Sequence, residues 1–286
     1  MTEKAAHVTN LDPWLDAYAA RAETLSVSEV RALFSVVSRP EVVSLAGGMP
    51  NVSALPNDVL QKAYEGMMAK RGPLAMQYGG GQGDLTFRDQ IRELMALEGI
   101  HSSVEDIVIT TGSQHGLDLL GGLFLDEGDV VLAEGPSYVG ALGIFRHYEA
   151  HVEHVYTDEN GMSPEALQES ITEMKRQGRK IKFLYLVPNF ANPSGVTLSA
   201  ERRPQIIEIC KREHILILED NPYGLLYFNQ PVPDALRSMD DNVIYLGSFS
   251  KILVPGFRVG YVLAPPAIRD KLVLANESAI LCPTSF

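Results

Sequence analysis

The amino-acid sequence predicts an α/β protein with a mostly parallel β-sheet and helices on both faces of that sheet. From residue 104 onward, short apolar runs bounded by turn residues alternate with longer segments of helical periodicity. This alternation is typical of parallel sheets that are covered on both sides. With 286 residues, of which 45% are hydrophobic and 21% charged, the chain is long enough for one large globular domain.

Composition excludes several classes of partner. A net charge of -12 argues against nucleic acid and anionic membranes. No apolar run approaches the ~20 residues that span a bilayer, and the N-terminus carries no secretion signal. Cys210 and Cys282 belong to no metal-binding or disulfide motif, which suits a reducing compartment. We therefore expect a soluble cytoplasmic protein without a metal, a membrane or a nucleic-acid partner.

The first hundred residues are predicted to be mainly helical. Apolar residues recur at helical spacing over residues 11–38, and Pro40 ends this pattern. A short strand then opens into a turn at Gly47 and Gly48, where backbone could approach a ligand, although the glycines alone favour an ordinary strand-end turn. The next expected elements are helices at 59–68 and 85–97, separated by a glycine-rich loop at 77–83.

The glycine-rich loop superficially resembles a dinucleotide-binding fingerprint. That fingerprint requires a buried strand directly before the loop and a βαβ frame around it. Residues 70–76 contain Arg71, Gly72 and Pro73 and do not read as such a strand. We therefore reject a dinucleotide site here.

Polar residues follow several of the predicted strands. Strands are expected at 106–110, 129–133, 152–156, 182–187, 215–218, 243–246 and 258–263, with helices at 117–124, 164–176 and 199–212 and another ending at 145. Ligands of such sheets bind beyond the carboxyl ends of the strands. The residues expected to meet at this edge are Gly112, Ser113, Gln114, Tyr138, Asn192, Asp220 and Lys251.

Lys251 lies in a small-residue turn between two apolar strands. Burying an ammonium group is costly, and desolvation lowers a lysine pKa. Such an amine is available as a nucleophile or for a covalent bond to a carbonyl. A lysine that extends from a strand end into solvent is the alternative.

An anion site is expected around the segment Gly112-Ser113-Gln114, because a helix begins there and its N-terminus favours a phosphate. Ser248, Ser250 and Arg258 are candidate additional donors, and an arginine can bind two oxygens at once. Ordinary turn serines and a surface ion pair of Arg258 are the alternatives.

Asp220 follows a buried strand, so its carboxylate should be partly desolvated and favour a cation such as a protonated ring nitrogen; turn capping is the alternative. Tyr223 and Asn192 offer a phenol and an amide to a ligand oxygen. Tyr138 offers a ring for stacking, although each of these three is more often structural. An anion site, a stacking ring, a carboxylate and a reactive lysine together describe a pyridoxal 5′-phosphate site.

These residues resemble the motifs of the fold-type I, class I/II aminotransferases, which depend on pyridoxal 5′-phosphate. The sequence is most similar to the branch with 2-aminoadipate and broad-specificity aromatic or branched-chain aminotransferases. The segments that carry the resemblance follow the family's order and lie at 44–50, 77–78, 111–114, 187–195, 219–223 and 247–258.

The resemblance implies a catalytic role for Lys251, Asp220 and Tyr223. Lys251 corresponds to the lysine that bonds covalently to the cofactor and later moves a proton as a free amine. Asp220 corresponds to the partner of the ring nitrogen, Asn192 and Tyr223 to the groups on the ring 3′-oxygen, and Tyr138 to the stacking aromatic.

The remaining cofactor and substrate contacts are also implied by the resemblance. The phosphate contacts are Ser113, Gln114, Ser248, Ser250 and Arg258. Tyr78 corresponds to a tyrosine that reaches the phosphate of a neighbouring subunit, which implies a homodimer. Gly47, Gly48 and Asn192 correspond to groups that contact the substrate.

The implied organisation has one departure from the family. Residues 1–45 should be an N-terminal helical segment of the small domain, 46–275 the large cofactor-binding domain, and 276–286 the start of an interdomain helix. The rest of the small domain, with an arginine for the substrate α-carboxylate, is not found. Either the chain is a fragment or another group, for which Arg21 is a candidate, binds that carboxylate.

The implied activity is transfer of an amino group from an α-amino acid to a 2-oxo acid, with 2-oxoglutarate as the expected acceptor and a ping-pong mechanism. A β-lyase or a decarboxylase with the same cofactor is an alternative, because the fold does not fix the chemistry. A cofactor-binding protein without turnover, as in regulators that carry a DNA-binding domain, is another. No basic helix-turn-helix segment precedes Trp14, which counts against the regulator.

Overall fold

The computed structural model describes residues 13–25, 39, 41–43 and 48–285, and the chain forms two compact units, Met1–Val43 and Ser44–Phe286. In the first unit, the described residues contain two 3-10 helices, η1 (Leu15–Ala17) and η2 (Ala20–Thr24). Over residues 13–25, these short turns replace the predicted long helix. Trp14 and Tyr18, whose spacing suggested that helix, are largely exposed, whereas most helices in proteins are stabilised by burial of an apolar face. The remainder of the predicted helix lies outside the described residues.

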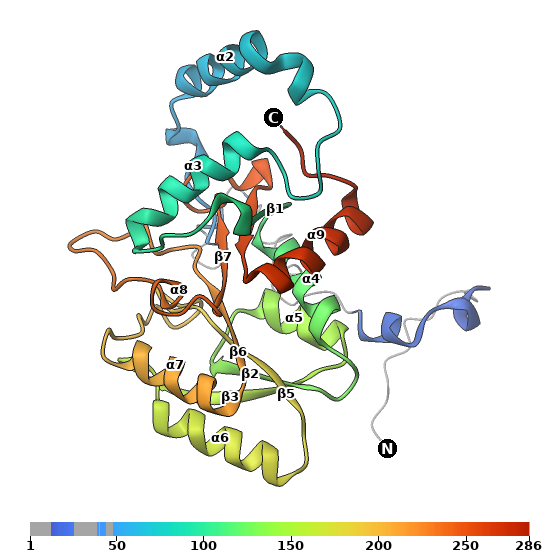
Figure 1. Ribbon diagram of the computed structural model, residues 1–286, viewed down its shortest axis with the longest axis vertical. Helices are drawn as coiled ribbons and strands as arrows, with labels where there is room; N and C mark the ends of the chain where they lie inside the picture. Colours follow the sequence, from blue (N-terminus) through green and yellow to red (C-terminus); the bar gives the residue numbers. More distant parts are fainter. Residues whose placement is uncertain (1–12, 26–38, 40, 44–47, 286) are drawn as a thin grey trace. The chain divides into compact units, whose positions relative to one another are not determined.

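The second unit is built on a mixed sheet of eight strands among the described residues, in the order β1-β8-β7-β6-β5-β2-β3-β4 (Figure 1). The strands are β1 (Ile107–Thr110), β2 (Val130–Gly135), β3 (His151–Asp158), β4 (Gly161–Met162), β5 (Ile181–Leu186), β6 (Leu216–Asp220), β7 (Ile244–Ser248) and β8 (Gly260–Leu263). Strands β3, β2, β5, β6 and β7 are parallel, whereas β8 is antiparallel to both of its neighbours. The predicted mostly parallel sheet is confirmed; β4, which pairs antiparallel with β3, was not predicted.

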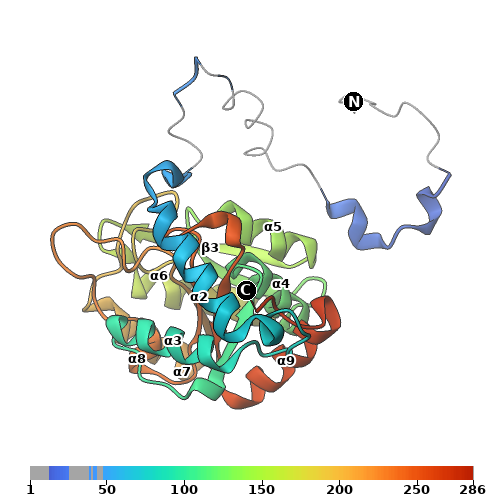
Figure 2. The same cartoon turned by 90° about the horizontal axis from the view of Figure 1, so that it is seen from above.

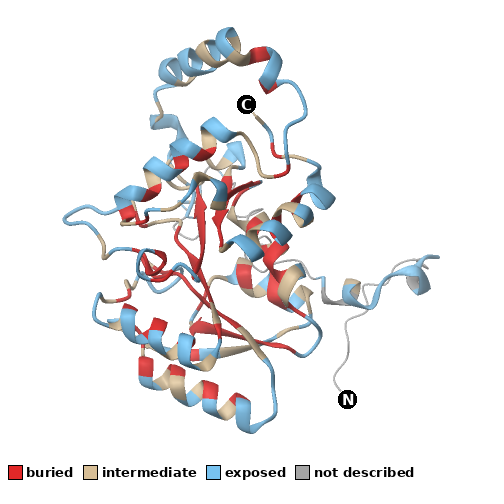
Figure 3. Ribbon diagram, in the orientation of Figure 1, coloured by how far each residue is buried: buried red, intermediate tan, exposed pale blue. Residues whose placement is uncertain are grey.

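Helices cover both faces of this sheet, as Figures 1 and 2 show. The helices of one face are α4 (Ser113–Phe124), α5 (Val139–His147) and α9 (Pro266–Ile280), and those of the other are α3 (Leu85–Met95), α6 (Pro164–Arg176), α7 (Arg202–Glu213) and α8 (Leu236–Met239). Alternation along β2 explains the two layers. Val131 and Ala133 pack into the core with α4 and α5, whereas Val130 and Leu132 pack with α6 and α7. Figure 3 shows that the strands of the sheet are largely buried between these helices.

Two helices differ most from their predicted bounds. Helix α2 (Asn57–Ala75) continues through Pro73, beyond the predicted end at residue 68. Helix α9 begins at Pro266 and ends at Ile280, where a helix had been expected over 276–286. Pro283 explains this end, because the residue before a proline avoids the α region. The remaining 3-10 helices of the described residues are η3 (Val52–Ala54), η4 (Ala96–Glu98), η5 (Val104–Asp106) and η6 (Pro255–Phe257). No helix in the described part of the chain has both the length and the apolar character needed to span a membrane.

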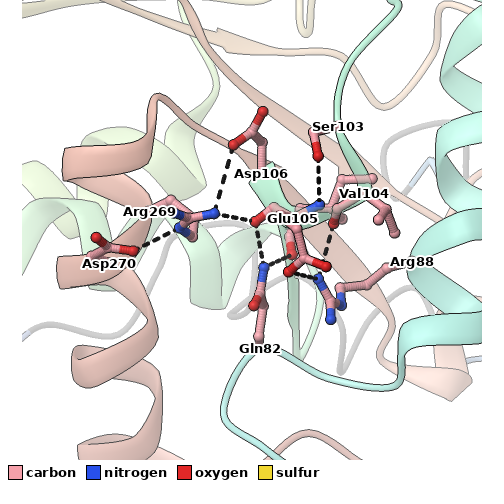
Figure 4. A network of polar contacts seen from close by, with 9 residues as sticks. Gln82, Arg88, Ser103, Val104, Glu105, Asp106, Arg269 and Asp270 are labelled. Carbon is pink, nitrogen blue, oxygen red and sulfur yellow. Dashed lines mark hydrogen bonds and ion pairs between the residues drawn. The ribbon is translucent and has the colours of Figure 1, made fainter.

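A polar network fixes the start of β1 (Figure 4). The Glu105 carbonyl accepts hydrogen bonds from Gln82 Nε2 and Arg269 Nη1, both at 2.5 Å. Arg88, which is largely buried, donates to the Val104 carbonyl at 2.9 Å. These contacts join α3, α9 and the loop before α3 to the beginning of β1. The opposite end of β1, which leads to the helix α4, pairs with β8 through Thr110 and Gly260.

Candidate active site

The parallel strands end at one rim of the sheet, and the predicted site residues gather there. Asp220 is the last residue of β6 and Ser248 the last of β7. Because β8 runs antiparallel to β7, Arg258, which precedes β8, lies at the same rim. Helix α4 begins at Ser113, three residues after β1. Residues more than a hundred positions apart in sequence thus meet at the carboxyl ends of the strands, where ligands of such sheets bind.

Of the two carboxylate oxygens of Asp220, one accepts a hydrogen bond from the protein and the other has no partner. The residue is 3% exposed. Its Oδ2 accepts a hydrogen bond from the Tyr185 hydroxyl at 2.8 Å, whereas its Oδ1 is buried without a partner. Desolvation raises the pKa of Asp220 to about 6, although the bond from Tyr185 acts in the opposite direction. A buried oxygen without a donor is costly, and a protonated ring nitrogen would supply that donor. The site therefore fits a cofactor with such a nitrogen.

Lys251 lies three residues after β7, with its amine partly withdrawn from solvent. Its Nζ donates to the Gly48 carbonyl at 2.9 Å. None of the ion pairs among the described residues involves this amine, and desolvation lowers the pKa of Lys251. The neutral amine, which is the nucleophilic form, is therefore more accessible than in an ordinary lysine.

Three further polar side chains of the predicted site interact with Asp220 or with one another. The Tyr223 and Asn192 side chains share a hydrogen bond, while burial and the charge of Asp220 raise the pKa of Tyr223. Burial likewise raises the pKa of Tyr138, with smaller contributions from Asp220 and Tyr223. The Tyr138 hydroxyl donates to Gln114 Oε1 at 3.3 Å. Asp220 therefore acts electrostatically on both phenols predicted around the cofactor ring, and the amide of Asn192 is linked to one of them.

The predicted anion site surrounds the N-terminus of α4. Arg258 donates from Nη2 to the Thr111 carbonyl at 3.4 Å and from Nη1 to Ser250 Oγ at 3.5 Å. The backbone N–H of Ser250 donates to Ser248 Oγ at 3.1 Å. An arginine and two serines therefore face the first turn of α4, where Ser113 and Gln114 lie. Free N–H groups, a helix dipole and a guanidinium at one point favour a phosphate.

Two glycines make this arrangement sterically possible. Gly112 has φ +82°, a value that side-chain-bearing residues rarely adopt, and a Cβ atom there would overlap the Arg258 guanidinium. A Cβ atom on Gly260 would lie 2.5 Å from the Gly112 carbonyl carbon and from the Ser113 nitrogen. Strand β8 can therefore approach the loop before α4 only because residue 260 has no side chain.

The structure does not test the predicted roles of three residues. Tyr78 is 78% exposed in the loop after α2, where its backbone N–H donates to Gln77 Oε1. Gly47 lies outside the described residues. Arg21 lies in η2 of the first unit. The roles assigned to these residues remain predictions.

A buried network that the sequence did not predict supports the loops after β5 and β6. Arg203, which is fully buried, donates to Asn189 Oδ1 at 2.7 Å. Asn189 Nδ2 donates to Asn221 Oδ1 at 3.0 Å, and Asn221 Nδ2 donates to Glu98 Oε1 at 2.6 Å. Tyr245 donates to the other oxygen of Glu98 at 2.6 Å. The network fixes Asn221 directly after Asp220, and Asn189 three residues before Asn192.

The fold and this rim together define a class: the α/β proteins that bind pyridoxal 5′-phosphate beyond the carboxyl ends of their strands. Comparison with known proteins then gives the family. Residues 40–286 match the family described as aminotransferase class I and II, and the chain belongs to this family. The predicted family, its fold type and its cofactor, pyridoxal 5′-phosphate, are thereby confirmed.

Individual relatives agree with this family. The chain is 38% identical over 272 residues to aromatic-amino-acid aminotransferase 1 of Thermococcus litoralis. The aligned region covers 94% of this chain and 65% of the relative. It is 35% identical over 273 residues to 2-aminoadipate transaminase of Thermus thermophilus, covering 94% of this chain and 66% of the relative. The structure matches a kynurenine aminotransferase of Pyrococcus horikoshii with a TM-score of 0.88 and 38% identity, over 94% of this chain and 67% of that one. The chain thus spans about two thirds of the length of these relatives.

Proposed function

We propose that this chain is a pyridoxal 5′-phosphate-dependent aminotransferase that moves an amino group from an α-amino acid to a 2-oxo acid by a ping-pong mechanism. One observation carries the proposal. The same rim of the sheet holds both Asp220, whose buried Oδ1 has no hydrogen-bond partner, and Lys251, whose amine is partly desolvated. The names of the relatives, which include aromatic amino acids, 2-aminoadipate and kynurenine, support an amino-acid donor. We take 2-oxoglutarate as the acceptor.

When bound, the cofactor supplies an electron-withdrawing ring that stabilises negative charge on the substrate α-carbon. Asp220 holds a proton on the ring nitrogen through Oδ1, which strengthens that withdrawal. The Lys251 amine would accept the proton that leaves the substrate α-carbon and would later give that same proton back, a role for which a lowered pKa is suited. Tyr223 and Asn192 provide hydrogen bonds to the ring oxygen.

Binding and orientation come from the remaining rim residues. Ser113, Gln114, Ser248, Ser250 and Arg258 hold the phosphate at the N-terminus of α4. Tyr138, whose hydroxyl donates to Gln114, would offer its ring for stacking on the cofactor. Gly47, Gly48 and Asn192 contact the substrate, and the Gly48 carbonyl that accepts from Lys251 marks where the substrate's polar groups would approach.

The surroundings of the site belong to the same proposal. The chain forms a homodimer in which the exposed Tyr78 reaches the phosphate of the neighbouring site. Residues 46–275 are the cofactor-binding domain, while 1–45 and the segment from 276 onward belong to the small domain. The acidic composition and the two unpaired cysteines support work in the cytoplasm.

An amino-transfer assay tests the proposal. The purified chain is loaded with pyridoxal 5′-phosphate and incubated with 2-oxoglutarate and, in turn, an aromatic amino acid, 2-aminoadipate or kynurenine. We expect glutamate and the donor's 2-oxo acid in equal amounts. Release of ammonia or carbon dioxide without glutamate would instead identify a lyase or a decarboxylase. Cofactor binding without any turnover would identify a binding protein.

Replacement of Gly112 by alanine is expected to weaken cofactor binding at least about tenfold, because the new methyl group displaces Arg258 from the phosphate site and one charge-assisted hydrogen bond is worth about 1.5–3 kcal/mol. Absorption titration with pyridoxal 5′-phosphate gives the dissociation constant. Gly128→Ala is the matched control: Gly128 has a similar φ of +79°, but a Cβ atom there meets nothing within 4 Å. Equal affinities of the two variants would contradict the assigned phosphate site.

A further inference from the structure

A tyrosine to which the proposed mechanism gives no role contacts its central carboxylate. Tyr185 lies on β5 and is fully buried. In the parallel register of β5 and β6 it pairs with Leu218, so it projects from the same face of the sheet as Leu218 and, two residues on, Asp220. Its ring packs edge-on against Phe145 of α5, with the ring centroids 5.4 Å apart. The hydroxyl is thereby fixed at 2.8 Å from Asp220 Oδ2.

We propose that Tyr185 is a positioning residue for the cofactor: its hydroxyl holds Oδ2 of Asp220, so that Oδ1 is directed at the ring nitrogen. This inference rests on the proposed function. A buried carboxylate with two free oxygens can rotate about its terminal torsion, which is broad. One fixed bond removes that freedom and leaves the other oxygen without a protein partner, as observed. The tyrosine also stabilises the ionised form of Asp220, because it donates to an oxygen that only the charged group presents fully.

Burial and the neighbouring acidic groups keep the Tyr185 hydroxyl protonated, so that it acts as a hydrogen-bond donor. The pKa of Tyr185 is raised well above its ordinary value by burial and by the charge of Asp220, so the phenol keeps its proton. Glu134 of β2 and Tyr138 at the start of α5 act on Tyr185 in the same direction. Burial, together with the charge of Asp220, also raises the pKa of Tyr223. In the described surroundings of Asp220, therefore, Tyr185 is the group that offsets the desolvation of its carboxylate.

Replacement of Tyr185 by phenylalanine tests the inference, because it removes one oxygen and keeps the ring that packs on Phe145. We expect the dissociation constant of pyridoxal 5′-phosphate, measured by absorption titration at pH 7.5, to rise about 10- to 100-fold, the range for losing a hydrogen bond to a charged group. We also expect the pKa of Asp220 in the cofactor-free protein to rise, as followed by NMR of ¹³C-labelled aspartate carboxyl groups. Asp220→Asn assigns the signal.

Tyr148→Phe is the matched control, because the Tyr148 hydroxyl donates to another aspartate, Asp118, at 3.3 Å. It should leave both readouts unchanged. The double variant Tyr185→Phe/Asp220→Asn separates positioning from a structural role: if Tyr185 acts through Asp220, its replacement costs little further affinity once Asp220→Asn is in place, whereas a structural effect would add in full. A dissociation constant of Tyr185→Phe within about threefold of wild type, or full additivity in the double variant, overturns the inference.

The two proposals fail in different ways. Tight cofactor binding that depends on Tyr185, without amino transfer to any 2-oxo acid, would overturn the proposed function and leave the positioning role standing. Amino transfer together with a cofactor affinity that does not change in Tyr185→Phe would overturn the positioning role and leave the proposed function standing.

Discussion

Replacing Lys251 with alanine is expected to lower the rate of amino-group transfer by at least about 10³-fold, because the variant loses both the nucleophilic amine and the proton carrier. The structure supplies the reason that this lysine, among those of the chain, is suited to the role. Its amine donates to the Gly48 carbonyl and is partly desolvated. The measurements are the initial rate of glutamate formation and the mass of the protein after borohydride reduction in the presence of cofactor. The wild type should retain the cofactor covalently, and Lys251→Ala should not.

Two controls sharpen this prediction. Lys251→Arg keeps a positive charge at the position, but a guanidinium does not lose its proton in proteins, so it should be as inactive as the alanine variant. Lys271→Ala removes an exposed lysine of α9 and should transfer amino groups at the wild-type rate. Undiminished covalent retention of the cofactor by Lys251→Ala would show that another lysine carries the bond.

The sheet was predictable because its strands are short, apolar and separated by turn residues. Where local periodicity was weak, the prediction failed: β4 has two residues and α8 has four, too few to show a period. Over residues 13–25, the helix predicted at 11–38 shows the opposite error. Its apolar spacing is helical, but Trp14 and Tyr18 are exposed, and spacing alone does not supply the packing that a helix needs.

The site was predictable where residues directly follow strands, because the carboxyl ends of parallel strands share one rim. Asp220 and Lys251 were found in this way. Tyr185 was not, because within the sequence it is one apolar-looking residue of a buried strand. Its role depends on the register of β5 against β6, which brings it to a residue 35 positions away. The network of Glu98, Asn189 and Asn221 was missed for the same reason.

Replacing Asp220 with asparagine is expected to lower the rate of amino transfer by about 10²- to 10³-fold, the effect of losing one preorganised electrostatic contact. Asparagine has nearly the same shape, but its neutral amide cannot stabilise a positive charge on a ring nitrogen. The charged oxygen Oδ1, which has no protein partner, would be replaced by a neutral amide that does not favour protonation of the ring nitrogen. Steady-state rates with a fixed amino-acid donor and 2-oxoglutarate measure the loss, and absorption titration measures the accompanying drop in cofactor affinity.

The pH dependence of cofactor affinity distinguishes a lost charge from a lost contact. The pKa of Asp220 is raised to about 6, above its ordinary value, so the carboxylate is ionised above pH 6 and becomes neutral as the pH falls through that value. Wild-type affinity should therefore decline below pH 6 relative to that of Asp220→Asn, which has no such group. The cofactor phosphate titrates in the same range in both proteins, so the ratio of their dissociation constants isolates the carboxylate. Asp118→Asn, which changes the aspartate bound by Tyr148, should keep the wild-type profile. A ratio that stays constant from pH 5 to pH 8 would mean that Asp220 does not act on the ring nitrogen as a charge.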